Sequence, residues 1–201
     1  MSTKRKESPK KSAEGPASIR FESTLETIGA RTILRLPEAA SRALPSRGQV
    51  AVRGTFAGQA FETVIEPDGE FGHWMNVDAE LLGRPGQRPT KLRPAADAEG
   101  AAVEVEITPT KDWPEPSVPP DLAEALANAP LQIRSLWSAI TPMARWEWVR
   151  WVNETKNPET RKRRVEVSLS KMSSGKRRPC CFNLASCTDP ELARSGKLPR
   201  S

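Results

Sequence analysis

The stretch LWSAITPMARWEWVRWVNETKNPETRKRRVEVSLSKMSSGKRR, residues 136–178, is where aromatic and basic residues gather most densely along the chain. Three of the six tryptophans fall within residues 146–151, and four basic residues follow one another at 161–164. Thr-Pro at 141–142 and Asn-Pro at 157–158 each place a capping side chain directly before a proline, which is the favoured start of a helix. The stretch therefore predicts two consecutive helices.

The first of these helices has an amphipathic pattern. At about 100° per residue, Ala144, Trp148, Trp151 and Val152 share one face, and charged residues share the opposite face. Large aromatic side chains contribute strongly to core packing, so a core role for Trp148 and Trp151 is favoured over ligand stacking. Trp146 projects off this face, which makes it a candidate interface residue.

The second helix is expected to end near Gly175, and its apolar face begins at Val165. Arg161 lies on the same side one turn earlier, and it needs a carboxylate or carbonyl partner because an unpaired buried charge is costly. Glu147 and Glu154 on the preceding helix are the predicted partners. The basic run around Arg161 points in several directions, which favours a solvated face over a nucleic-acid-binding patch.

Two shorter helices are predicted upstream. Apolar residues recur at i, i+3, i+4 and i+7 within residues 122–129 and again within 133–140. The segment 111–119 that precedes them is rich in proline and predicts a stiff connector. Residues 120–176 are therefore expected to form a bundle of about four helices.

The N-terminal half has the period-two pattern of strands. Apolar and polar residues alternate in several short segments between residues 18 and 110, with turn residues between the segments. Val103, Val105 and Ile107, for example, alternate with glutamates. About six short strands in this span predict a small β-barrel, so the fold class is α+β, with a barrel domain at 18–110 followed by the helical domain.

Local features of the barrel segment are also predicted. Ala57-Gly58 marks a tight turn between two strands, and Gly54 marks a bulge. Residues 37–45 are expected to contain a short helix that starts at a proline. A helical turn is expected at 78–83, and an irregular loop at 84–100.

The formal net charge of +6 is concentrated at the two ends of the chain. Residues 1–17 and residues 177–201 each carry five Lys or Arg against two acidic residues, and the span between them is neutral as a whole. Within that span, 18–119 is acidic and 120–176 is basic, by four charges each. Residues 1–17 have almost no apolar content and are expected to be a disordered basic tail. Residues 177–201 are polar, basic and interrupted by Gly and Pro, and are expected to be a flexible basic tail.

Residues with catalytic or metal-binding chemistry are sparse. His73 is the only histidine and has no Ser or Cys motif beside it, which favours a structural role. Cys180, Cys181 and Cys187 lack the paired CxxC spacing of zinc sites and are expected to be free thiols. Gly-rich phosphate loops are absent as well. The sequence predicts no catalytic constellation, no metal and no cofactor, and it disfavours an enzyme.

The sequence also bears on location. No run of apolar residues approaches the roughly 20 that a membrane-spanning helix needs. The basic N-terminus lacks the apolar core of a secretory signal. We therefore expect a soluble, cytoplasmic protein without a membrane span.

Motifs of the two halves follow one another in a recognisable order. Those of the C-terminal half are Pro120-Asp121-Leu122, Ala125-Leu126, Arg150-Trp151-Val152, Lys156, Glu159-Thr160-Arg161, Arg163-Arg164 and Gly175-Lys176-Arg177. The segment from Val118 to Asn183 that contains them resembles the bacteriocin-protection, or YdeI/OmpD-associated, family. Those of the N-terminal half are Leu36-Pro37, Val52-Arg53-Gly54-Thr55, Gly58, Phe61 and Val105. The segment 21–107 resembles a small β-barrel domain of unknown function that is often fused upstream and is regarded as AbrB-like.

This resemblance implies a role in protection against bacteriocins or cationic antimicrobial peptides and in stress tolerance, with no reaction attached to the fold. The favoured function is therefore a non-enzymatic interaction protein with a protein or peptide partner. One alternative is a nucleic-acid-binding regulator that uses the AbrB-like barrel and binds weakly through the basic tails. The other is a small-ligand binder or enzyme with a pocket between the two halves, near Arg53, His73 or Trp74. The candidate binding or motif residues are Arg53, Trp74, Trp146, Arg150, Trp151, Lys156, Thr160, Arg161 and Arg164.

Overall fold

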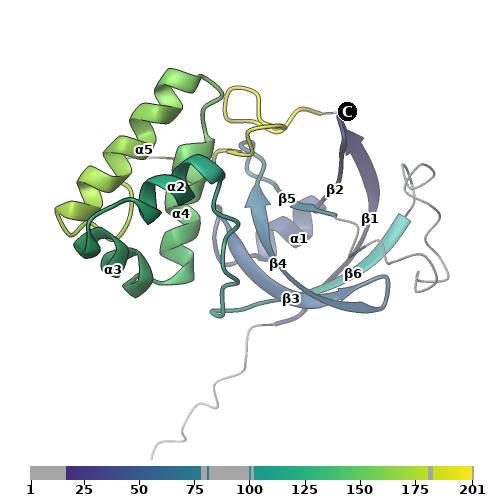
Figure 1. The fold of residues 1–201 in the computed structure, drawn as a ribbon. Coiled ribbons are helices and arrows are strands. Elements are labelled where there is room, and N and C mark those ends of the chain that lie inside the picture. The colour runs from purple at the N-terminus through teal and green to yellow at the C-terminus, as the bar shows by residue number, and fades with distance from the viewer. Residues whose placement is uncertain (1–16, 78–80, 82–99, 101, 181–182, 201) are drawn as a thin grey trace, which may run out of the picture.

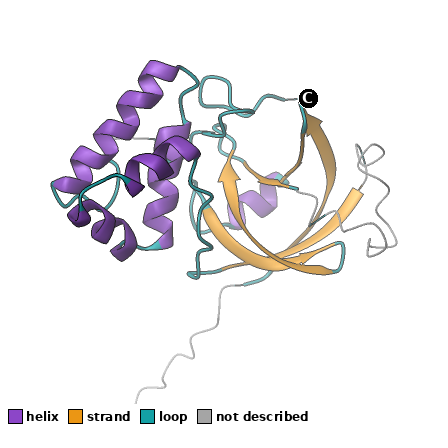
Figure 2. Ribbon diagram, in the orientation of Figure 1, coloured by secondary structure: helices purple, strands orange, loops and turns teal. Residues whose placement is uncertain are grey.

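The two halves of the chain differ in secondary structure: the strands lie in the N-terminal half and most helices in the C-terminal half (Figure 1, Figure 2). These features come from a computed structural model, which describes residues 17–77, 81, 100, 102–180 and 183–200. The predicted α+β class, a small barrel followed by a helical domain, is confirmed.

Three predicted features fall almost wholly outside the described residues. The N-terminal tail is described only at Ala17. The helical turn at 78–83 is described only at Leu81, and the loop at 84–100 only at Gly100.

Six antiparallel strands close into a barrel in the order β1-β2-β5-β4-β3-β6. In β6 the side chains of Val103, Val105 and Ile107 are buried and Glu104 is exposed, because successive side chains of a strand point to opposite faces. The inward-facing apolar residues of all six strands form the barrel core. The strand bounds are β1 Ile19–Ile28, β2 Arg31–Arg35, β3 Val50–Phe56, β4 Gln59–Pro67, β5 His73–Asn76 and β6 Ala102–Pro109.

A short helix, α1 (Glu38–Ala43), follows β2, as the proline at its start predicts. Its residue Ala40 and Leu44, which follows the end of the helix, are buried in the barrel core. The helix therefore helps to fill the barrel.

The β3–β4 hairpin turns at Ala57 and Gly58, which have φ values of 49° and 84°. Left-handed backbone at both positions suits a two-residue hairpin turn, so the predicted turn is confirmed. The predicted bulge at Gly54 is wrong, because pairing with β4 continues one-to-one along the whole of β3. Glycine is needed there for a different reason: a Cβ atom on Gly54 would lie 1.8 Å from the carbonyl oxygen of Glu106 on β6.

The described residues of the C-terminal half form four helices, as predicted. The Thr141 hydroxyl accepts a hydrogen bond from the Ala144 amide at 3.3 Å, and the Asn157 side chain accepts one from the Thr160 amide at 2.9 Å. Both N-caps are therefore the ones that the sequence indicates. In the described part of the chain, no helix is long and apolar enough to cross a membrane. The helix bounds are α2 Pro120–Ala127, α3 Leu131–Ala139, α4 Pro142–Asn153 and α5 Pro158–Ser173.

Tryptophans of α4 anchor the core between the helices. Trp148 is fully buried, and the half-buried Trp151 meets it edge to face with ring centroids 6.1 Å apart. Trp148 belongs to the apolar cluster that α2, α3, α4 and α5 share, and Trp151 packs against this cluster. The predicted core role of these two residues is confirmed.

The C-terminal segment 183–200, for which a flexible tail is expected, packs against the barrel in this structure. The Leu198 amide donates a hydrogen bond to the Asp68 carbonyl at 2.8 Å. Figure 1 shows the segment in yellow, running from the helical half to one end of the barrel. Its few apolar residues are too widely spaced to form a helix or strand pattern, yet they complete a third apolar cluster. That cluster contains Ile33, Trp74, Cys187, Leu192 and Leu198.

Candidate functional site

Arg161 links three helices. Its guanidinium donates to both carboxylate oxygens of Asp121 at the start of α2, at 2.6 and 2.9 Å, and to Asn153 Oδ1 at 3.0 Å. The predicted partners Glu147 and Glu154 are therefore wrong, because Arg161 pairs with Asp121. Glu147 pairs instead with Arg178, and Glu154 pairs with Arg164. The hydrogen bonds from Arg161 also lower the pKa of Asp121. Arg161 is thus engaged within the fold.

Other motif residues close the turn between α4 and α5. The guanidinium of Arg164 lies 5.4 Å from the Trp151 ring centroid and pairs with Glu154 at 2.8 Å. The Thr160 amide is bound by the N-cap of α5. Lys156, in the turn itself, is exposed. Apart from Lys156, these residues make contacts that hold α4 and α5 together or cap α5.

Trp146 is hydrogen-bonded to the proline-rich connector at 111–119. Its indole N–H donates to the Pro114 carbonyl at 2.8 Å, and the neighbouring Arg145 pairs with Glu115 at 2.6 Å. The connector runs between the barrel and the helices in Figure 1. The interface that Trp146 makes in this structure is thus internal to the chain.

Arg150 joins the helical half, the barrel and the C-terminal segment. Only 3% of it is exposed. Its Nε donates to Thr188 Oγ1 at 3.1 Å and lies 3.5 Å from Glu66 Oε2 of β4. Its Nη2 donates to the carbonyls of Ser186 at 2.8 Å and Leu184 at 3.3 Å. Sequence reasoning picked out Arg150 as a motif residue but had no means of finding these partners.

Burial shifts the pKa values of this ion pair. Burial raises the pKa of Glu66 in spite of the nearby Arg150 charge, and it lowers the pKa of Arg150. Gln49 supports the pair by donating to Glu66 Oε1 at 2.5 Å. The pair therefore sits in a weakly solvated junction, where attraction between charges is stronger than at the surface.

A crevice of about 240 Å³ opens beside Arg150, between the barrel and α4. At its polar side, the Glu147 carboxylate accepts two hydrogen bonds from Arg178, one of them from Nε at 2.5 Å. Arg53, His73 and Trp74 do not line it. We call this space the junction crevice, and its lining residues are Pro45, Ser46, Gly48, Gln49, Val50, Ala51, Thr110, Trp113, Met143, Glu147, Arg150, Arg178 and Leu184.

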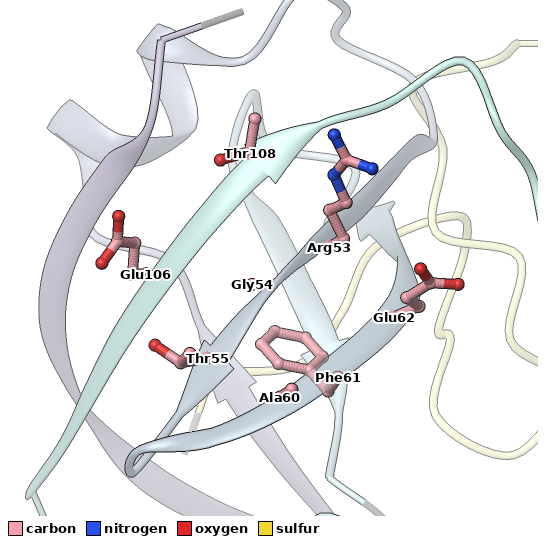
Figure 3. A pocket seen from close by; sticks show the side chains of 8 residues that line it. All are labelled: Arg53, Gly54, Thr55, Ala60, Phe61, Glu62, Glu106 and Thr108. Carbon is pink, nitrogen blue, oxygen red and sulfur yellow. The ribbon is translucent and has the colours of Figure 1, made fainter.

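Arg53 lies instead on the outer face of the barrel, over a hollow of about 650 Å³ on β3, β4 and β6 (Figure 3). It stands opposite Glu62 on β4 and Thr108 on β6. Figure 3 shows the charged side chains of Arg53, Glu62 and Glu106 standing apart, without a common point of approach. A binding site needs convergent polar groups, so the junction crevice is the stronger candidate.

His73 and Trp74 are buried and make hydrogen bonds within the fold. Trp74 is buried and its indole N–H donates to the Pro67 carbonyl at 3.2 Å. His73 Nε2 lies 3.2 Å from the Gly48 carbonyl, which only accepts, so Nδ1 accepts from the Ser41 hydroxyl at 2.6 Å. Ser41 is distant in sequence, and no local motif indicates this contact. The pair is buried and ties α1 to β5.

The buried His73 predicts a pH dependence of stability. Burial lowers its pKa from the usual 6.5, so the unfolded chain takes up this proton at a higher pH than the folded chain. The free energy of unfolding should therefore fall as the pH drops below about 6.5. Glu66 acts in the opposite direction, since its raised pKa favours the folded state as pH falls.

Chemical denaturation at a series of pH values checks this, with His73→Gln as the comparison. The variant should show a flatter dependence than the natural protein below about pH 6.5, because glutamine does not titrate. Equal slopes for the two proteins would show that His73 does not carry the effect.

Two of the three cysteines, Cys180 and Cys187, lie in the described part of the chain. Burial raises the pKa of Cys187 to about 11, so its thiol stays protonated at neutral pH. Cys180 is exposed, and Cys181 lies outside the described residues. Within the described ranges, no group of three His, Cys, Asp or Glu side chains is placed to hold a metal ion.

Comparison with known proteins gives two matches. Residues 115–191 match the family described as Bacteriocin-protection, YdeI or OmpD-Associated. Residues 21–87 match a domain of unknown function, DUF1905. No curated protein matches the chain significantly. Neither match carries the AbrB-like label, which stays a prediction. The chain is therefore similar in its barrel half to DUF1905 and in its helical half to the YdeI or OmpD-associated bacteriocin-protection family.

Proposed function

We propose that this protein is a non-enzymatic binding protein that contributes to tolerance of bacteriocins or other antimicrobial peptides, and that a cationic side chain of the peptide binds in the junction crevice. One observation carries the proposal: both family-matched segments line this crevice. Gln49 comes from the segment matched at 21–87, and Glu147 and Arg178 come from the segment matched at 115–191.

The size of the crevice suits a side chain better than a whole small molecule. Pockets for drug-sized ligands span about 300–1,000 Å³. The junction crevice, at about 240 Å³, is smaller than that range. We therefore expect it to accept one long side chain of a peptide while the rest of the peptide stays on the surface.

Arg150 and Arg178 also line the crevice, and Glu147 is the lining residue that can bind a positive side chain. The Glu147 side chain is only 9% exposed, whereas its partner Arg178 is 51% exposed. A half-exposed guanidinium contributes little to stability, so an incoming Lys or Arg can take its place against the buried carboxylate. Trp113 and Met143 line the crevice and offer apolar surface for the aliphatic stem of that side chain.

The binding test compares Glu147→Gln, Arg178→Gln and Lys176→Gln by isothermal titration with a lysine-rich amphipathic peptide. A hydrogen bond to a charged group contributes about 1.5–3 kcal/mol, so Glu147→Gln should weaken binding about tenfold or more. Arg178→Gln should strengthen binding, because it removes the internal competitor. Lys176→Gln is the matched control: Lys176 is exposed, carries the same charge, does not line the crevice and should leave binding unchanged.

Survival of cells under peptide challenge tests the biological role. Cells that lack the gene should survive less well, and expression of the natural protein or of Lys176→Gln should restore survival. Glu147→Gln should fail to restore it while unfolding at a similar temperature. An unchanged survival curve in the deletion strain would count against the proposed function, and normal peptide binding by Glu147→Gln would count against the crevice.

A further inference from the structure

A separate hollow of about 620 Å³ lies on the barrel, away from the junction crevice, between α1, the turn before β5 and the C-terminal segment. Four arginines contribute to its lining, which is a high density of guanidinium groups for one site. We call it the arginine hollow, and its lining residues are Arg35, Leu36, Glu38, Ser41, Arg42, Arg47, Asp68, Glu70, Phe71, Gly72 and Arg200.

Phe71 is the unusual residue of this hollow. Its side chain is 82% exposed, the largest exposure among the large hydrophobic residues that the structure describes. Its backbone has a φ of 74°, which is a left-handed conformation. Bulky side chains rarely adopt this conformation. Strained backbone positions cluster at active sites and ligand-binding sites, where the strain serves function and the surrounding structure holds the residue in place. An aromatic ring held in water on a strained backbone is thus a candidate contact for a ligand.

The turn that carries Phe71 is held from two sides. The Asp68 side chain accepts hydrogen bonds from the Glu70 and Gly72 amides at 2.7 and 2.8 Å. Arg47 donates one of its guanidinium N–H groups to the Phe71 carbonyl at 3.1 Å. The ring is therefore presented on a pre-organised loop, which lowers the entropic cost of binding a partner.

Four arginines and three acidic residues, Glu38, Asp68 and Glu70, line the hollow that contains this ring. Arg200 pairs with Glu70 at 3.1 Å, and Arg42 pairs with Glu38 within α1. The side chains of Arg42 and Arg200 are 67% and 83% exposed, so a ligand can reach both. The hydrogen bond to the Phe71 carbonyl occupies one of the five N–H groups of the Arg47 guanidinium. Guanidinium groups bind phosphate in bidentate fashion, and the hollow offers several of them next to an exposed aromatic face.

We propose that the arginine hollow binds a nucleotide unit, with the planar base stacked on Phe71 and the phosphate held by Arg47 together with Arg42 or Arg200. A stacking ring beside a cationic groove is the arrangement by which proteins hold nucleotides of single strands without reading their sequence. The same chemistry is offered by a free mononucleotide and by one nucleotide of a single-stranded nucleic acid. The proposal does not depend on the junction crevice.

Fluorescence anisotropy with a labelled single-stranded oligonucleotide and titration with adenosine monophosphate distinguish these two sources. The test uses the full chain at low salt. Binding of the oligonucleotide alone identifies a nucleic-acid strand, and its affinity should fall steeply as salt is raised. Binding of the mononucleotide with comparable affinity identifies a free nucleotide. Either outcome supports the hollow, provided that the variants below behave as expected.

Substitutions at Phe71 separate binding from folding. Phe71→Ala should lower affinity about tenfold, the effect of losing one stacked base. Phe71→Gly should lower affinity equally while raising the unfolding temperature, because glycine adopts this φ without strain. A rise in stability together with a loss of binding is an outcome that a purely structural Phe71 would not produce.

Substitutions of Arg47 and Arg53 test whether binding depends on an arginine inside the hollow or on positive charge elsewhere on the barrel. Arg47→Gln should lower affinity about tenfold by removing a phosphate contact. Arg53→Gln on the outer face of β3 removes the same charge outside the hollow and should leave affinity within about twofold. The proposal is overturned if neither probe binds at low salt, if Phe71→Ala binds as the natural protein does, or if Arg53→Gln weakens binding as much as Arg47→Gln.

Discussion

Replacing Arg150 with alanine is expected to lower the free energy of unfolding by about 3–5 kcal/mol, the cost of removing one partner from a buried charged network. The change leaves Glu66 without its buried cation and the carbonyls of Leu184 and Ser186 without their donor. Each of these groups then loses a contact that offsets its desolvation, although Glu66 keeps the hydrogen bond from Gln49. The effect is large because one guanidinium serves the helical half, the barrel and the C-terminal segment at once.

Denaturant unfolding followed by tryptophan fluorescence measures this change. Glu66→Gln and the double variant complete a double-mutant cycle, in which the two substitutions should couple strongly because the side chains are in contact. Arg134→Ala is the matched control, since Arg134 is an exposed arginine of α3 and should change stability by less than about 0.5 kcal/mol. A loss of under 1 kcal/mol in Arg150→Ala would show that the junction does not depend on this network.

Replacing Leu198 with alanine is expected to cost about 2–5 kcal/mol, the usual range for truncating a buried leucine. Leu198 is 2% exposed and packs in the cluster that includes Ile33 and Trp74 of the barrel. Loss of this anchor should loosen the segment 183–200. Since Leu184 and Ser186 of that segment supply carbonyls to Arg150, the damage should spread to the junction.

Unfolding experiments on Leu198→Ala and Leu131→Ala test this expectation. Leu131 is 70% exposed, so the same truncation there removes little buried surface and should change stability by less than about 0.5 kcal/mol. Limited proteolysis adds a second measure, because Leu198→Ala should be cut sooner within 183–200 than the natural protein. Equal stability and equal proteolysis of the two variants would mean that this segment is a flexible tail in solution.

The C-terminal segment also matters for the proposed function. Leu184 lines the junction crevice, and Arg178 leads into this segment from α5. A variant that releases the segment should therefore weaken peptide binding even when the barrel and helices remain folded. Peptide binding by Leu198→Ala can be measured at low temperature, where this variant is still folded, and compared with peptide binding by Glu147→Gln.

Local features of this protein could be predicted from its sequence because each depends on neighbouring residues. The alternation of Val103, Val105 and Ile107 places β6 in the barrel wall, and Thr141 and Asn157 mark the starts of α4 and α5. Periodicity and capping are properties of a few consecutive residues, so no knowledge of the remaining chain is needed to recognise them.

The tertiary structure alone decided which distant side chains meet. Arg161 pairs with Asp121 instead of Glu147 or Glu154, and Arg150 meets Glu66 across the boundary between the two halves. Leu198 becomes a core residue because the barrel presents Trp74 to it. The physical reason is that charged groups and scattered apolar residues take whatever partners the packed elements bring within reach. A single sequence records which residues need partners, and only the packed chain determines which partners they find.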